Sequence, residues 1–171
     1  AAGRPDIARG LFEEALTDLG EQTGVGSGAE LAAVIRHNLA AALKAEGRYD
    51  EALVELDLAL QENLRLTKLI EAASNHYLAA SIHSKVGRYD EALTNATEAL
   101  ILDRQMENSL GIAQDHRALG IINFSLRNYE QSLQHYAHSP ETPPATAERA
   151  QELYSELRYL NRLFRCTCLC R

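Results

Sequence analysis

The strongest constraint in this 171-residue sequence is a seven-residue phrase that returns after 40 positions. Segment 47–53 reads GRYDEAL, and segment 87–93 repeats it letter for letter. A weaker copy, RNYEQSL, stands at 127–133, at the same interval. A fixed period in this range indicates stacked repeats, each of them one supersecondary unit. Because repeat arrays mostly present a surface to a partner, we expect binding rather than reaction chemistry.

Each phrase lies between two stretches with helical spacing. In segment 30–43 the apolar residues recur every three or four positions, and Ala and Leu favour helices. Gly47 suits the left-handed residue that ends a helix, and Asp50 and Glu51 place negative charge where the next helix begins. The unit is therefore predicted to be an antiparallel helix hairpin. Small residues recur where its helices would touch: Ala40, Ala80 and Gly120 in the first helix, and Ala52, Ala92 and Ser132 in the second.

These positions resemble the motif of the tetratricopeptide repeat family. The first unit matches it at Ala40, Gly47, Tyr49, Ala52, Leu56 and Ala59. The second unit matches at Ala80, Gly87, Tyr89, Ala92, Ala96 and Ala99. The third keeps Gly120, Tyr129 and Tyr136 but has Arg127, Ser132 and Ser139 in place of Gly, Ala and Ala. The resemblance implies an all-α, right-handed superhelix of antiparallel helix hairpins, a solenoid whose first helices line a concave groove.

The period differs from the family's usual one of about 34 residues. The extra residues, about six per unit, are expected to lengthen helices across Gln61–Ile70 and Arg104–Ile112, where no strong helix breaker occurs. Long-period repeats of this kind resemble those of bacterial signalling and transcription regulators and of certain eukaryotic scaffold proteins.

The repeats are expected to occupy residues 1–139, followed by a linker with a C-terminal capping helix at 140–165 and a tail at 166–171. The expected boundaries are a partial unit at 3–23 and units at about 29–65, 67–105 and 107–139. Because the partial unit, with Pro5 suited to a first helical position, echoes only a second helix, we expect a fragment of a longer protein. The capping helix is predicted at 147–164, with Ala150, Leu153, Leu157, Leu160 and Phe164 on one stripe. It covers the open end of the stack, or else docks on another subunit or folds into the groove.

Composition and motifs exclude several classes of function. The net charge of −7, from 24 acidic and 17 basic residues, argues against a nucleic-acid surface. No apolar run is long enough to span a membrane and no signal peptide is visible, so we expect a cytoplasmic protein. The glycine-rich segment 24–28 lacks the context of a phosphate-binding loop and is interpreted as a flexible loop.

The histidines and cysteines do not form a recognisable metal motif. The histidine pairs are His76 with His83 and His135 with His138, and neither has a third ligand at a recognisable spacing. The cysteines, Cys166, Cys168 and Cys170, alternate in a way that does not suit a zinc knuckle, and their role stays open. We therefore expect no metal, no cofactor and no enzymatic activity.

The groove is the predicted binding site. Its candidate residues are His37, Asn38, Lys44, Tyr77, Ser81, Lys85, Arg117, Ile121 and Phe124. The register of the second unit is ambiguous, because His76 aligns with Arg36 at a spacing of 40 and with His37 at 39. Family members that grip a peptide's terminal carboxylate use a set of Lys, Asn and Arg residues. That set is absent here, where the matching positions hold His37, Ala41, Leu78, Gln114 and Ala118.

The sequence thus predicts a protein- or peptide-binding scaffold of unknown partner. The alternative is a ligand- or peptide-sensing regulatory domain of a bacterial signalling or transcription regulator. Neither nucleic acid nor membrane is an expected partner of this domain, and a homo-oligomer through the C-terminal helix is an open expectation.

Overall fold

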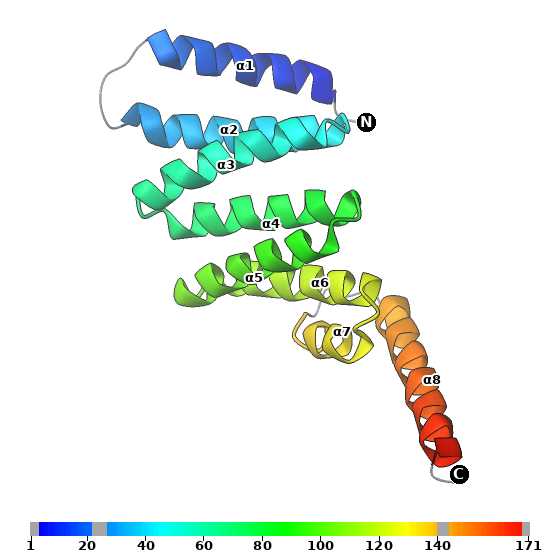
Figure 1. Ribbon diagram of the computed structural model, residues 1–171. Coiled ribbons are helices and arrows are strands. Elements are labelled where there is room, and N and C mark those ends of the chain that lie inside the picture. The colour runs from blue at the N-terminus through cyan, green and yellow to red at the C-terminus, as the bar shows by residue number, and fades with distance from the viewer. Residues whose placement is uncertain (1–3, 22–26, 140–143, 169–171) are drawn as a thin grey trace. The chain divides into compact units, whose positions relative to one another are not determined.

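A computed structural model describes residues 4–21, 27–139 and 144–168, which form eight α-helices and no β-strand (Figure 1). The helices are α1 (Pro5–Glu21), α2 (Ser27–Ala45), α3 (Tyr49–Arg65), α4 (Leu69–Lys85), α5 (Tyr89–Gln105), α6 (Ser109–Ser125), α7 (Tyr129–Tyr136) and α8 (Pro144–Cys168). The predicted all-α class is confirmed, and successive helices pack as in a helical repeat. The chain divides into two compact units, residues 1–112 and 113–171.

The helices follow a finer period than the sequence phrase suggests. Their first residues, Tyr49, Leu69, Tyr89, Ser109 and Tyr129, are 20 positions apart. Helices α3 to α6 span 17 residues each, and a three-residue turn follows each of them. The prediction of helices running across Gln61–Ile70 and Arg104–Ile112 is therefore wrong, because turns at 66–68 and 106–108 interrupt both.

These turns share one hydrogen-bond pattern, in which a backbone N–H reaches back to the carbonyl five residues earlier. Arg48 donates to Leu43 across 2.9 Å within a hairpin, and Lys68 donates to Asn63 across 2.8 Å between hairpins. The middle residue adopts positive φ, which Gly47 and Gly87 accommodate at 80° and 79°. Thr67 stands in the same conformation at 56°. Sequence reasoning missed this turn because no glycine marks it.

The structure settles the register of the second unit at 40 residues. Arg36 on α2 pairs with Glu55 on α3 at 2.6 Å, and His76 on α4 bonds Asn95 on α5 at 3.0 Å. The two pairs link first and second helices at the same relative positions, so His76 takes the place of Arg36. The alternative alignment of His76 with His37 is wrong.

The core of the first unit lies where α3 packs against both α2 and α4. Its buried members are Leu39, Ala40, Leu43, Ala52, Leu56, Ala79 and Ile82. Ala40 and Ala52 are completely buried, which shows why the sequence keeps small residues where the helices meet. On α2, Ala33 is buried, whereas the predicted core residues Ala32 and Ile35 are only half-buried.

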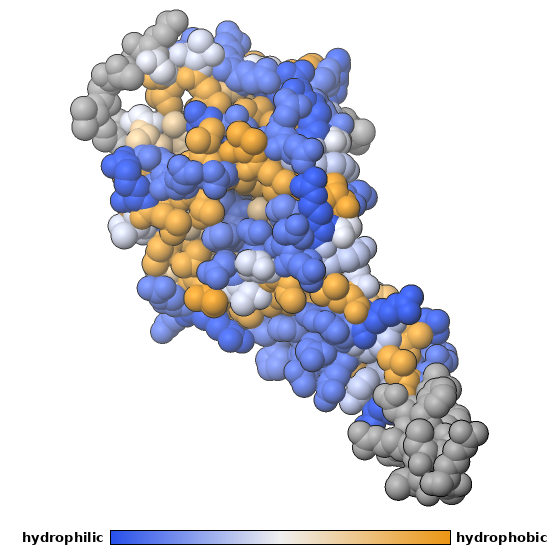
Figure 2. Space-filling model, viewed as in Figure 1, coloured by the Kyte–Doolittle hydropathy of each residue, from blue (hydrophilic) through white to orange (hydrophobic). Residues whose placement is uncertain are grey.

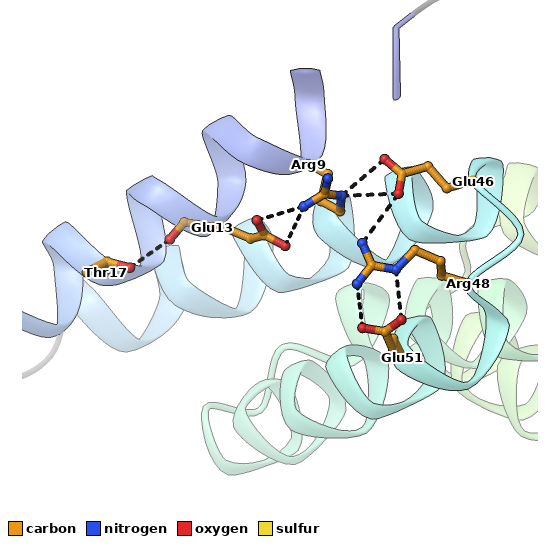
Figure 3. Close-up of polar contacts among 6 residues, drawn as sticks. All are labelled: Arg9, Glu13, Thr17, Glu46, Arg48 and Glu51. Atoms are coloured by element: carbon orange, nitrogen blue, oxygen red, sulfur yellow. Dashed lines mark hydrogen bonds and ion pairs between the residues drawn. The ribbon is translucent and has the colours of Figure 1, made fainter. Parts of the chain in front are cut away.

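Helix α1 is joined to the first hairpin by a polar network (Figure 3). The Arg9 guanidinium donates to both carboxylate oxygens of Glu46 at 3.1 Å and to Glu13 at 2.9 Å. Arg48 bridges the same Glu46 carboxylate, at 3.4 Å, to Glu51, at 2.6 Å. Glu46 therefore links α1 to the α2–α3 turn, while Phe12 and Leu16 add apolar contacts to the core.

In the second unit, α6 and α7 approach very closely. Gly120 leaves room for the ring of Tyr136, and the Ser132 hydroxyl donates to the Gly120 carbonyl at 2.8 Å. Helix α7 is only 8 residues long, as the predicted break after Ser139 requires. Helix α8 packs on α7 and buries Ala150, but Leu157 stays exposed, so the predicted stripe is covered only in part.

Helix α8 begins earlier and extends further than the predicted 147–164. The side chains of Leu160, Phe164 and the three cysteines, and most of the glycine-rich segment 24–28, lie outside the described residues. Within the described part of the chain, no helix combines the length and apolar character needed to cross a membrane.

Candidate functional site

Two polar bridges join the first helices of successive hairpins in the first unit. His37 Nδ1 on α2 lies 2.7 Å from Asn75 Oδ1 on α4. Lys44 Nζ on α2 donates to Ser81 Oγ on α4 across 2.7 Å. The two bridges are about 10 Å apart along α2, at 1.5 Å per residue. We call the surface that carries these four residues the α2–α4 seam.

A cleft opens at the N-terminal end of this seam. It has a volume of ≈ 180 Å³ and brings together residues of three helices: Ala33, Val34, His37, Asn63, Glu71, Ser74 and Asn75. Asn63 and Asn75 are 3% and 2% exposed, whereas Val34, Glu71 and Ser74 reach the surface. The α2–α4 cleft therefore has amide groups among its buried members and a mixed apolar and acidic rim.

The His37–Asn75 bond determines which groups the cleft can offer. Because the Asn75 amide oxygen can only accept, neutral His37 carries its proton on Nδ1 and leaves Nε2 as an acceptor. The Asn75 Nδ2 is buried and has no acceptor within the described part of the chain. Leaving such a donor unsatisfied costs about 1–3 kcal/mol. Asn75 is thus held in place by its oxygen while its two N–H donors are unused.

The next turn along the chain shows what is missing at the cleft. There Asn108 Nδ2 donates to Asp103 Oδ1 at 2.8 Å, and the Asp103 carboxylate fills the space beside Gly111. Forty residues earlier the same three positions hold Lys68, Asn63 and Glu71. Lys68 donates instead to Glu30 on α2, at 2.6 Å. The clasp that closes the later turn is therefore replaced by an opening here.

The C-terminal end of the seam is basic. Lys44 is half-buried, and Lys85 on α4 is exposed. Burial, and then the nearby ammonium of Lys85, lower the pKa of Lys44 below its ordinary value. The C-terminal ends of α2 and α4 favour these cations through the helix dipole. An anionic group placed between the two lysines would relieve their repulsion.

The remaining predicted groove residues are less closely grouped. Asn38 is exposed on α2, and Tyr77 is half-buried on α4. Arg117, Ile121 and Phe124 belong to the second unit, where Ile121 is exposed and Phe124 packs edge-on against Tyr129 with ring centroids 5.5 Å apart. The idea that Tyr77 and Arg117 face one ligand spans both units and stays a prediction.

Sequence reasoning missed the residues that give the cleft its character, namely Asn63, Glu71 and Asn75. One signal was available. Asn75 stands at core spacing from Ala72 and Ala79, where the helical pattern calls for an apolar side chain. A polar residue at a core position is informative because burying it is costly without a partner.

In the second unit the structure adds a third histidine to a predicted pair. His116 Nδ1 lies 3.0 Å from His135 Nδ1, and the ring of His116 stacks on that of His138 at 4.9 Å. His116 is the repeat equivalent of His76, which sequence reasoning did not use. Across the described residues, however, no group of three or more His, Cys, Asp and Glu side chains is arranged to hold a metal ion.

A scan against protein-family models finds no match for this chain, and a search of curated proteins finds no similar sequence. The functional argument therefore rests on the arrangement of the residues themselves.

Proposed function

We propose that this chain is a tetratricopeptide-like helical repeat that acts as a protein- or peptide-binding scaffold, with the α2–α4 seam as its binding surface. The observation that carries the proposal is the α2–α4 cleft, where Asn75 is fixed by His37 and presents an unused amide donor. A buried donor of this kind is uncommon in a folded protein unless a partner completes it.

The rest of the seam suits an extended peptide. Leu31 and Val34 on α2 are 50% and 45% exposed and offer apolar contact beside the polar groups. Apolar residues also reach the surface over α1 to α4 (Figure 2). The distance of about 10 Å between the two polar bridges matches about three residues of an extended chain, at roughly 3.3 Å each. A mixture of apolar contact and a few fixed polar groups is typical of recognition sites.

The seam also has an electrostatic direction. Glu71 lies at the rim of the cleft, and Lys44 and Lys85 lie at the other end. We expect the bound peptide to place an acidic side chain between the two lysines. Such a contact lies near the protein surface, so it contributes about 0.2–1 kcal/mol and weakens as salt is added.

The test is selection of peptides from a random display library on the whole chain, followed by binding measurements and NMR mapping. Amide resonances of α2 and α4 should shift on binding. Lys85→Glu should weaken binding about fivefold, equivalent to ~1 kcal/mol. The matched control is Arg158→Glu on α8, which makes the same change in charge at an exposed site and should have no effect. Failure to select any peptide, or shifts confined to α8, would contradict the proposal.

A further inference from the structure

We infer that the α2–α4 cleft binds the side-chain carboxamide of a glutamine in the partner peptide. The inference rests on the proposed peptide-binding function and specifies the chemistry that one part of that surface recognises.

The hydrogen-bonding groups of the cleft are those of a neutral amide-binding site. Asn75 Nδ2 requires an acceptor, and its Oδ1 is already engaged by His37. His37 Nε2 and the Glu71 carboxylate are acceptors at the same cleft. A ligand that combines one acceptor with nearby donors satisfies both sets. The primary carboxamide has this combination, with a carbonyl oxygen and an NH₂ group on one carbon.

Charge and shape narrow the choice further. No Lys or Arg lines the cleft, and Glu71 at its rim repels a carboxylate. An ammonium group would leave Asn75 Nδ2 without an acceptor, since it can only donate. Ala33 and Val34 provide an apolar wall for a methylene stem. The volume of ≈ 180 Å³ far exceeds the ~10–15 Å³ that a single water needs, so the cleft has room for a side chain. These properties favour glutamine, with its longer stem, over asparagine.

Reaching Asn75 requires a small adjustment, because its Nδ2 is shielded from solvent. The neighbouring side chains that can move are His37, which is half-buried, and Ser74, which is exposed. Side-chain rotations of this size are common when complexes form. The position is also individual to this hairpin, since 40 residues later the chain has Asp115 in place of Asn75. An aspartate there accepts hydrogen bonds and would not select a carbonyl oxygen.

The first experiment titrates the whole ¹⁵N-labelled chain with propionamide, the analogue of the glutamine side chain, and follows NMR shifts. Saturable shifts are expected at residues 33, 34, 74 and 75, including the Asn75 side-chain NH₂. Propionate and propylammonium should bind at least about tenfold more weakly, as expected when a buried polar group is left unpaired. Equal binding of propionate, or no saturable shift at any concentration, overturns the inference and leaves the cleft as a site for water only.

Two variants separate recognition from folding. Asn75→Asp removes the donor and should abolish propionamide binding, whereas the matched change Asn38→Asp, at an exposed position on α2, should not. Val34→Phe, which adds a ring at the exposed edge of the cleft without touching Asn75, should also block the probe. Circular dichroism verifies that each variant is folded. Retention of propionamide binding by folded Asn75→Asp or Val34→Phe overturns the inference.

The second experiment distinguishes this inference from the broader proposal. A selected peptide is varied at each Gln to Glu, Lys and norleucine, and binding is measured to the wild type and to Asn75→Asp. One glutamine should lose at least about tenfold in affinity on replacement, and the loss should disappear in Asn75→Asp. Binding that maps to the seam but tolerates every replacement refutes glutamine recognition and leaves the scaffold proposal standing. If no peptide binds while propionamide still does, the scaffold proposal fails and the cleft is a small-amide site.

Discussion

The close approach of α6 and α7 gives a sharp test through the substitution Gly120→Ala. A Cβ built on Gly120 would lie 2.3 Å and 2.4 Å from two ring carbons of Tyr136. Tyr136 is 6% exposed, and the hydrogen bond from Ser132 to the Gly120 carbonyl holds the helices together. The ring therefore cannot move aside without disturbing the contact between the helices.

The sign of the effect separates packing from helix propensity. Alanine in place of glycine inside a helix gains about 1 kcal/mol when nothing obstructs it. Overpacking a buried contact costs about 1–3 kcal/mol. Gly120→Ala should therefore lower the free energy of unfolding by up to about 2 kcal/mol. The matched control is Gly10→Ala on α1, where an added Cβ meets nothing within 4 Å. It should be neutral or stabilising by up to ~1 kcal/mol.

The repeat itself supplies the compensating change. In the first hairpin the equivalent pair is Ala40 with Leu56, and both residues are buried in one cluster. Combining Gly120→Ala with Tyr136→Leu should reproduce that pair. A double-mutant cycle from urea unfolding, followed by circular dichroism, should give a favourable coupling of at least about 1 kcal/mol. Additive effects, or a Gly120→Ala variant as stable as Gly10→Ala, would refute the packing argument.

Three further predictions use the first unit and the predicted groove. Ala92→Leu should reduce the free energy of unfolding by about 1–3 kcal/mol, because Ala92 is fully buried, while Glu98→Ala at an exposed site should change it by less than about 0.5 kcal/mol in the same denaturation assay. Burial lowers the pKa of His83 from 6.5, an effect to which Arg88 adds and which Glu91 and Asp50 oppose, so the unfolded chain binds the proton more readily and stability falls as pH drops below about 6.5. His83→Leu, copying the first hairpin, should reduce this loss of stability in urea midpoints measured between about pH 7.5 and pH 5.5; an unchanged pH dependence would count against it. Arg117→Ala and Tyr77→Ala should each weaken binding of a selected peptide by about 1–2 kcal/mol without loss of helicity, and a double variant that binds as well as the wild type would remove both from the site.

Much of the helical framework could be predicted from sequence because its signals are local. The returning phrase identified the hairpin unit, and Gly47 and Gly87 marked turns because positive φ favours glycine. Pro5 begins α1, as its fixed φ predicts. The turns at Thr67 and Glu107 were missed for the complementary reason. Both residues adopt positive φ, and the surrounding backbone bonds hold a conformation that their own preferences disfavour.

The sequence by itself determined the helices, their period and the small residues at their contacts. Only the tertiary structure decided the binding surface. His37 and Asn75 are 38 positions apart, and helical periodicity orients each side chain about its own axis without setting the distance between two axes. That distance depends on how α3 packs between α2 and α4, and hence on buried side-chain volumes summed over the core. The cleft beside Asn75 is a product of this packing, and no local pattern in the sequence encodes it.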